Sequence, residues 1–225
     1  MRIDFQQVSV TRDGRNLLDS LTLTLEERRI GIIGANGSGK TTLARLCNGL
    51  VLPDTGRVLV EGLDTRKEVA EVRRRVGMVF QFPEAQIIQP IVLEDVAFGL
   101  QLRGFSGKQA RAEAEELLRR LDLWELAERT AHSLSGGERQ LVALAAVLIT
   151  KPELILFDEP TNQLDLRHRN RLRARLRALP AQVIVVTHDL ELLDDFDRVL
   201  LLDEGQLVFD GPPAQAVARY VAACA

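Results

Sequence analysis

The chain opens with an alternation of apolar and polar residues, which is the pattern of half-buried strands. In Leu17–Leu25, the leucines at 21, 23 and 25 alternate with Thr22 and Thr24, and Ile3–Val10 has a similar period. One face of each predicted strand is therefore covered and the other is hydrated. These two strands are expected to belong to a small antiparallel sheet of their own.

Three later runs, Leu154–Phe157, Val183–Val186 and Val199–Leu202, are apolar throughout, which predicts strands that are buried on both faces, as in a parallel sheet. They are separated by stretches with helical period, and this alternation is typical of an α/β fold. The expected strands are Arg29–Ile33, Val58–Val60, Val76–Phe80, Leu154–Phe157, Val183–Val186 and Val199–Leu202, and the expected helices are Lys40–Leu50, Val92–Gly99, Lys108–Leu121 and Gly136–Thr150.

Composition places the chain among ordinary globular proteins. It has 225 residues, of which 46% are hydrophobic and 27% charged, and its net charge is −3, so no global basic field attracts nucleic acid. Its two cysteines form no disulfide framework, which favours a reducing compartment. The longest apolar run, Leu141–Ile149, is far shorter than the roughly 20 residues of a membrane span. We expect a soluble, cytoplasmic protein.

A glycine-rich segment follows the strand Arg29–Ile33 and opens a helix. Gly34-Ala35-Asn36-Gly37-Ser38-Gly39-Lys40-Thr41 fits the pattern G-x-x-x-x-G-K-[ST] at every fixed position. In that context the backbone amides curl around a phosphate, and the start of the helix adds positive potential. Lys40 is expected to bridge the β- and γ-phosphates, and Thr41 to offer its hydroxyl to Mg²⁺.

Two carboxylates end the apolar strand Leu154–Phe157. Asp158 lies where α/β folds bind ligands and would hold Mg²⁺, whereas Glu159 points elsewhere and could polarise an attacking water. Lys40 and Asp158 are 118 residues apart. A simple strand–helix–strand crossover needs about 30 residues, so we expect a helical insertion from Gln86 to Thr150.

A further turn, Leu134-Ser135-Gly136-Gly137-Glu138-Arg139-Gln140, lies inside the predicted insertion. Ser135 and Glu138 form the pattern of a capping box that opens the next helix. Two consecutive glycines in a first helical turn cost about 1 kcal/mol each relative to alanine. Bare amides at a helix start suit a phosphate, and we interpret the turn as both a cap and a phosphate site.

Taken together, GANGSGKT, LSGGERQ and LILFDEP resemble the ATP-binding cassette (ABC) ATPases over essentially the whole chain. The resemblance implies a single P-loop NTPase domain with bound ATP and Mg²⁺. Its RecA-like parallel core and small β subdomain would take residues 1–85 and 151–225, and its helical subdomain residues 86–150. It also implies that two cassettes pair head to tail, so that Ser135, Gly136, Gly137 and Glu138 cap the ATP of the partner.

The resemblance assigns further residues one by one. Gln81 is similar to the glutamine that touches Mg²⁺, His188 to the histidine that senses the γ-phosphate, and Asp165 lies in the loop that contacts the dimer partner. Thr42 belongs to the phosphate loop. Arg12 stands where the family has an aromatic residue; it could stack on adenine or be an ordinary exposed arginine. His132 and His168 are expected at the surface.

Within the family, the stretch from Val79 to Gly99 resembles the ATPases of energy-coupling-factor transporters, which import vitamins and transition-metal ions. That resemblance implies a second ATPase, a transmembrane coupling subunit and a substrate-binding membrane subunit as partners, at the inner face of the cell membrane. Val92–Gly99 would line the docking groove, with Glu94 and Asp95 meeting basic residues; alternatively, both acids merely favour a helix start. The short end after Pro212-Pro213 resembles the biotin-type ATPase.

A second interpretation is a soluble ABC ATPase that works on ribosomes or nucleic acid, because EPTNQLD is similar to the EPTNHLD stretch of such proteins. Arginines follow at 167, 169, 171, 173, 175 and 177. Spaced by two on a helix they spread around its surface, which favours a solvated helix. The ribosomal type also carries two cassettes in one chain, whereas this sequence has one. A DNA-repair ATPase would need a long coiled coil, which the insertion lacks.

Overall fold

The computed structural model describes residues 1–162 and 164–224. Its centre is a six-stranded sheet in the order β10-β9-β3-β8-β7-β6, in which β10 pairs antiparallel with β9 and the other neighbours are parallel. The strands are β3 (Arg29–Gly34), β6 (Val76–Val79), β7 (Leu154–Asp158), β8 (Gln182–Val186), β9 (Arg198–Asp203) and β10 (Gln206–Gly211). The predicted α/β class and its parallel sheet are confirmed.

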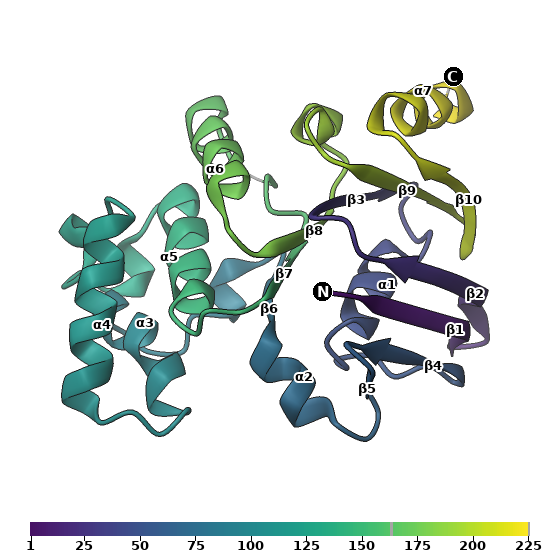
Figure 1. The fold of residues 1–225 in the computed structure, drawn as a ribbon. Coiled ribbons are helices and arrows are strands. Elements are labelled where there is room, and N and C mark those ends of the chain that lie inside the picture. Colours follow the sequence, from purple (N-terminus) through teal and green to yellow (C-terminus); the bar gives the residue numbers. More distant parts are fainter. Residues whose placement is uncertain (163, 225) are drawn as a thin grey trace.

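A second, antiparallel sheet has the order β2-β1-β4-β5 and lies beside the first (Figure 1). Its strands are β1 (Ile3–Arg12), β2 (Arg15–Leu25), β4 (Thr55–Val60) and β5 (Leu63–Asp64). The alternating apolar residues of β1, among them Ile3 and Phe5, are fully covered. The prediction of a separate small sheet is thus confirmed, although β5 carried no signal of its own.

Helix α1 (Lys40–Leu46) packs between the two sheets, where Leu43 and Leu46 are buried in one apolar cluster with side chains of both. The expected helix extended to Leu50 and was too long. The chain turns after Leu46, because the amide of Leu50 donates to the Arg45 carbonyl and to the Asn48 side chain instead of continuing the helix. Helix α2 (Val69–Arg75), which was not anticipated, follows β5.

Three helices form a group beyond the β6 edge of the sheet: α3 (Val92–Gln101), α4 (Gly107–Arg120) and α5 (Gly136–Leu148) (Figure 1). They share an apolar core of their own, which includes Leu93, Leu118 and Val142. Four short 3₁₀ turns connect elements, at Pro83–Ala85, Trp124–Leu126, Ala131–Ser133 and Leu190–Leu193. Helix α5 also contributes Leu144 and Val147 to the apolar cluster on the central sheet, so it connects the helical group to that sheet.

Helices α6 (Leu166–Ala178) and α7 (Pro213–Cys224) cover the other face of the central sheet. The arginines of α6 are less free than the sequence suggested. Arg169, Arg173 and Arg177 pair with Asp189, Asp194 and Asp195. Within the described ranges, every helix is too short or too polar to cross a lipid bilayer.

Candidate nucleotide site

The phosphate loop, Gly34–Thr41, connects the end of β3 to the start of α1. At Gly39, φ is +99°, and an added Cβ would lie 2.3 Å from the Leu17 carbonyl oxygen, so only glycine fits there. At Gly37, φ is +80°, but an added Cβ would meet nothing within 4 Å. One side of the loop is therefore packed against β2, while the other is open.

Lys40 is drawn back into this loop. Its Nζ donates to the carbonyl oxygens of Gly34 at 2.8 Å and Ala35 at 2.7 Å, and its side chain is largely buried. The pKa of Lys40 is lowered, because burial disfavours the charged form more than the nearby carboxylates of Glu159 and Asp158 favour it. The ammonium group is thus positioned at the base of the loop by acceptors that belong to the loop itself.

Asp158 ends β7 and is fully buried. The hydroxyl of Thr41 donates to its Oδ1 at 2.7 Å, and the guanidinium of Arg45 lies 3.4 Å from its Oδ2. The contact exists because β7 and β3 run parallel on either side of β8, so that the carboxyl end of β7 lies near the loop that follows β3. Arg45 gave no signal in sequence, since nothing near it marks it as a partner of Asp158.

Glu159 adopts a left-handed backbone conformation, with φ of +49°. Seven other non-glycine residues among those described share this conformation, so it does not by itself mark a functional site. Its amide donates to the Val186 carbonyl at 2.9 Å, and its Oε2 lies 2.7 Å from Nδ1 of His188. The two residues predicted to act near the γ-phosphate are therefore in direct contact.

A hollow of about 220 Å³ lies over the phosphate loop and extends to Glu159; Asp158 and His188 are not part of its lining. Its lining combines the loop with residues that are distant in sequence: Leu17, Asn36, Gly37, Ser38, Gly39, Lys40, Thr41, Thr42, Gln81 and Glu159. Leu17 was not anticipated, because an apolar strand residue carries no chemical signal. Backbone amides, an ammonium and hydroxyl groups are suitable ligands for a polyphosphate.

The donor set also fits Mg²⁺, which prefers oxygen ligands: a hydroxyl at Thr41, a carboxylate at Asp158 and an amide oxygen at Gln81. No group of three or more His, Cys, Asp or Glu residues in the described part of the chain is arranged to hold a metal ion. The side chains here would therefore share the ion with phosphate oxygens, as is usual for Mg²⁺. The buried Ser38 hydroxyl has no hydrogen-bond partner among the described residues, and a phosphate oxygen could satisfy it.

The signature turn, Ser135–Glu138, opens α5 in the helical group and does not line this hollow. The expected capping box is confirmed: Oγ of Ser135 accepts from the Glu138 amide at 3.3 Å, and Glu138 accepts from the Ser135 amide at 2.7 Å. The Ser135 amide, with the guanidinium of Arg129 as a smaller cause, lowers the pKa of Glu138.

Two further predictions concern the histidines. His132 is exposed, as expected. His168 is not a free surface residue, because its side chain is only 25% exposed and its ring packs on Gly137. It also lies 2.8 Å from Oδ1 of Asp165, the residue that caps α6.

Arg12 does not line the hollow. Its Nη1 donates to the Thr11 carbonyl at 2.7 Å and lies 3.3 Å from Asp54. Half of its side chain remains exposed. Stacking on adenine thus stays a prediction, and it would have to compete with the ion pair to Asp54.

Asp95 was expected to face a partner, and this was wrong. It is 5% exposed, and its Oδ1 accepts from the amides of Ile88 at 2.7 Å and Gln89 at 2.9 Å. The pKa of Asp95 is raised, because the effect of burial exceeds the opposite effect of these two hydrogen bonds. The carboxylate therefore holds the segment before α3 in place, and only Glu94 of the two acids is exposed.

Comparison with known proteins identifies the class. The family model described as ABC transporter matches residues 18–162. The biotin transport ATP-binding protein BioM of Rhizobium etli is 51% identical, with 98% of each chain covered. The energy-coupling factor transporter ATP-binding protein EcfA1 of Caldanaerobacter subterraneus is 41% identical over 88% of this chain and 74% of its own. The cobalt import ATP-binding protein CbiO of Syntrophus aciditrophicus is 42% identical over 88% and 73%.

Solved structures agree. CbiO1 of Clostridium perfringens, described as part of the ABC transporter complex cbiONQ, superposes with a TM-score of 0.84 at 28% identity, covering 97% of this chain and 92% of its own. The dimeric cassette MJ0796, bound to ADP and Pi, gives a TM-score of 0.83 at 28% identity, covering 94% and 98%. The chain belongs to the ABC transporter family and is an ATPase of the energy-coupling-factor type.

Proposed function

We propose that the chain is the ATP-hydrolysing subunit of a membrane importer of the energy-coupling-factor type, and that it works as one of two paired cassettes. The observation that carries this proposal is the hollow on the phosphate loop, which contains Lys40, Gln81 and Glu159 but not the signature turn. A second cassette, identical or different, would supply Ser135–Glu138 in trans. The dimeric form of MJ0796 supports this arrangement.

In this mechanism the amides of Gly34–Thr42 and the ammonium of Lys40 bind the phosphates. Thr41 and Asp158, with Gln81, would hold Mg²⁺, which neutralises charge on the phosphates. Glu159 orients the attacking water and accepts its proton. His188 would keep the Glu159 carboxylate in place through the 2.7 Å contact, and its role as a sensor of the γ-phosphate rests on the family resemblance.

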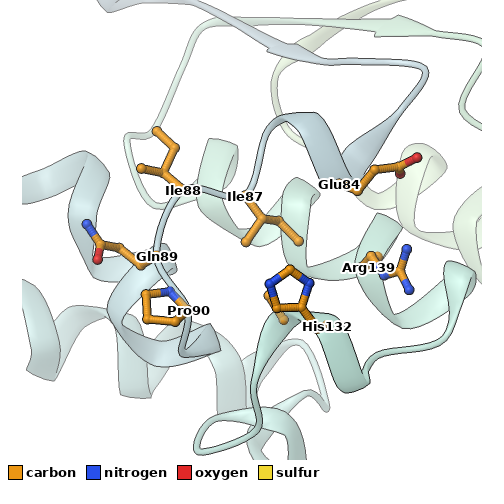
Figure 2. A pocket seen from close by; sticks show the side chains of 8 residues that line it. Glu84, Ile87, Ile88, Gln89, Pro90, His132 and Arg139 are labelled. Atoms are coloured by element: carbon orange, nitrogen blue, oxygen red, sulfur yellow. The ribbon is translucent and has the colours of Figure 1, made fainter.

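The proposed docking surface for a transmembrane coupling subunit begins just after Gln81, at the 3₁₀ turn Pro83–Ala85. A groove of about 230 Å³ is lined by Glu84, Ile87, Ile88, Gln89, Pro90, Ala131, His132 and Arg139. Figure 2 shows His132 and Ile87 close to each other in it, with Glu84 and Arg139 toward one end. A second hollow, of about 300 Å³, contains Glu94 and shares Gln89 with the groove. Ile88 is 68% exposed, so an apolar contact is available there.

This surface replaces the docking pair expected from the sequence. Glu94 and Ile88 would contact the coupling subunit. Asp95 would act indirectly, because its carboxylate accepts hydrogen bonds from the amides of Ile88 and Gln89 and so fixes the segment that carries Ile88. With the substrate-binding membrane subunit, the complex would place this chain at the cytoplasmic face of the membrane.

Biotin is the favoured substrate, because BioM is 51% identical over nearly all of both chains. A transition-metal ion is the alternative, since CbiO is 42% identical. Action on nucleic acid is less well supported, because the α6 arginines at 169, 173 and 177 are paired with carboxylates.

The test is purification of a tagged chain from detergent-solubilised membranes of the cells that make it, followed by identification of the associated proteins. We expect two membrane proteins and ATP-dependent uptake of labelled biotin by the reconstituted complex. Ile88→Glu should abolish complex formation while nucleotide affinity stays normal. Val208→Glu is the control: it makes the same kind of change at an exposed apolar residue of β10, outside the groove. Recovery with ribosomes, or without any membrane protein, would contradict the proposal.

A further inference from the structure

The imidazole of His168 fills the space over Gly137. A Cβ added to Gly137 would lie 2.3 Å from Cδ2 of His168, 2.5 Å from Cγ and 2.8 Å from Nε2. Real Cβ contacts of this length essentially never occur, so any side chain at 137 would displace the ring. Gly136, by contrast, has nothing within 4 Å of an added Cβ. The contacts of an added Cβ therefore require glycine at position 137, where the His168 ring lies, but not at position 136, which faces open space.

The same ring is fixed on its other side by Asp165. Nδ1 of His168 lies 2.8 Å from Oδ1 of Asp165, and that oxygen also accepts from the His168 amide at 2.8 Å. Because a carboxylate only accepts hydrogen bonds, Nδ1 carries the proton. These two hydrogen bonds lower the pKa of Asp165, the amide being the larger cause. The ring therefore has little freedom to rotate away from Gly137.

The contact joins the first turn of α5 to the first turn of α6. Gly137 belongs to the helical group, whereas Asp165 and His168 begin α6 on the central sheet. Toward the other ends of α5 and α6, a cavity of about 870 Å³ opens; its walls include Leu144 and Leu148 of α5 and Arg175 and Ala178 of α6. The beginning of α5 is thus tied to α6 through His168, while a cavity lies between the later parts of the two helices.

We propose that His168 is a positioning residue that couples the signature turn to the Asp165 loop, so that both segments meet the partner cassette as one unit. This inference rests on the proposed pairing of two cassettes. The hydrogen bond to Asp165 links the ring to the loop that precedes α6. The contact with Gly137 links the same ring to the first turn of α5 and fixes the position of that turn. Nucleotide binding to the Lys40 loop of the same chain does not involve this contact.

The test compares His168→Ala, which removes the ring, with His168→Phe, which keeps a ring over Gly137 but cannot donate to Asp165. Misplacement of a catalytic segment by about 1 Å can cost roughly 10²-fold in rate. We expect His168→Ala to lower kcat by about 10-fold or more, within that range, with KM and the affinity of the single cassette for a fluorescent ATP analogue changed less than about twofold. His168→Phe should fall between this variant and the wild type.

A second pair of variants separates coupling from simple stability. Gly137→Ala should be inactive because its methyl group collides with the ring, and adding His168→Ala should restore part of the activity. The single cassette must retain its melting temperature in each case. Unchanged kcat in His168→Ala, or a double variant no better than Gly137→Ala, would overturn the inference. A loss explained by a lower folded fraction would also overturn it.

The controls distinguish this inference from the proposed function. If the wild-type chain neither hydrolyses ATP nor forms an ATP-dependent dimer, the proposed function fails. If the wild type does both and the His168 variants behave like it, only the coupling role fails.

Discussion

The carboxylate of Glu159 lies 2.7 Å from Nδ1 of His188, although 29 residues separate them in sequence. The pairing follows from the sheet, because β7 and β8 are parallel neighbours and both residues lie just beyond their carboxyl ends. The backbone amide of His188 also donates to the same oxygen, at 3.3 Å. The proposed base, Glu159, thus lines the phosphate-loop hollow, and His188 contacts its carboxylate.

Glu159→Gln should leave ATP binding intact and lower turnover by about 10² or more, the range for loss of a general base. The amide side chain can still accept from His188, so the local structure is retained. Steady-state hydrolysis and size exclusion with ATP would measure both effects, the second showing a trapped dimer. Glu191→Gln, an exposed change on the same side of the sheet, is the control, and equal activity of the two variants would exclude this role.

Two inactive chains should complement each other if the sites form in trans. Lys40→Ala damages the phosphate loop, and Gly136→Asp places a negative charge on the signature turn at a position with open space around it. A mixed dimer then carries both lesions in one site and leaves the other intact. Hydrolysis measured across mixing ratios should exceed that of either parent. Absence of recovery, with mixed dimers demonstrated, would count against shared sites.

Removal of the Asp95 carboxylate should destabilise the segment before α3. Asp95→Ala leaves the amides of Ile88 and Gln89 without their acceptor, which costs about 1–3 kcal/mol. Asp95→Asn keeps an oxygen for both amides and should cost less. Urea denaturation would measure the difference, and the exposed Glu94→Ala should stay within about 0.5 kcal/mol of the wild type. Equal stability of Asp95→Ala and the wild type would contradict this role.

The capping box at the signature turn should make stability depend on pH. The pKa of Glu138 is lowered in the folded chain, mainly by the Ser135 amide, so its contribution is present above the usual glutamate value of about 4.3 and is lost as pH falls below it. Glu138→Gln lacks this dependence. Thermal melting of the two proteins should therefore differ most at pH 7, and the difference should shrink as the pH is lowered through about 4.3 and further. A constant difference across this range would contradict the assignment.

Much of this protein can be inferred from local sequence. The phosphate loop, the strand with Asp158 and the capping box are short-range patterns, in which residue type and backbone requirement coincide within a few positions. The alternation in β1 and β2 likewise reflects burial of one face of each strand. The family resemblance adds the expectation that two cassettes pair. Neither the composition nor the spacing of apolar residues indicates this pairing.

Only the tertiary structure decided which side chains meet. Whether Asp95 is presented to a partner or buried against Ile88 depends on how the segment before α3 folds back on its helix. The contacts of Arg45 with Asp158 and of His168 with Gly137 join segments that share no local pattern. Their geometry follows from strand order and helix packing, because these place residues far apart in sequence within a few ångströms. Sequence determined the chemistry that is available to this ATPase, and the order of the parallel strands determined which of its side chains meet at the phosphate loop.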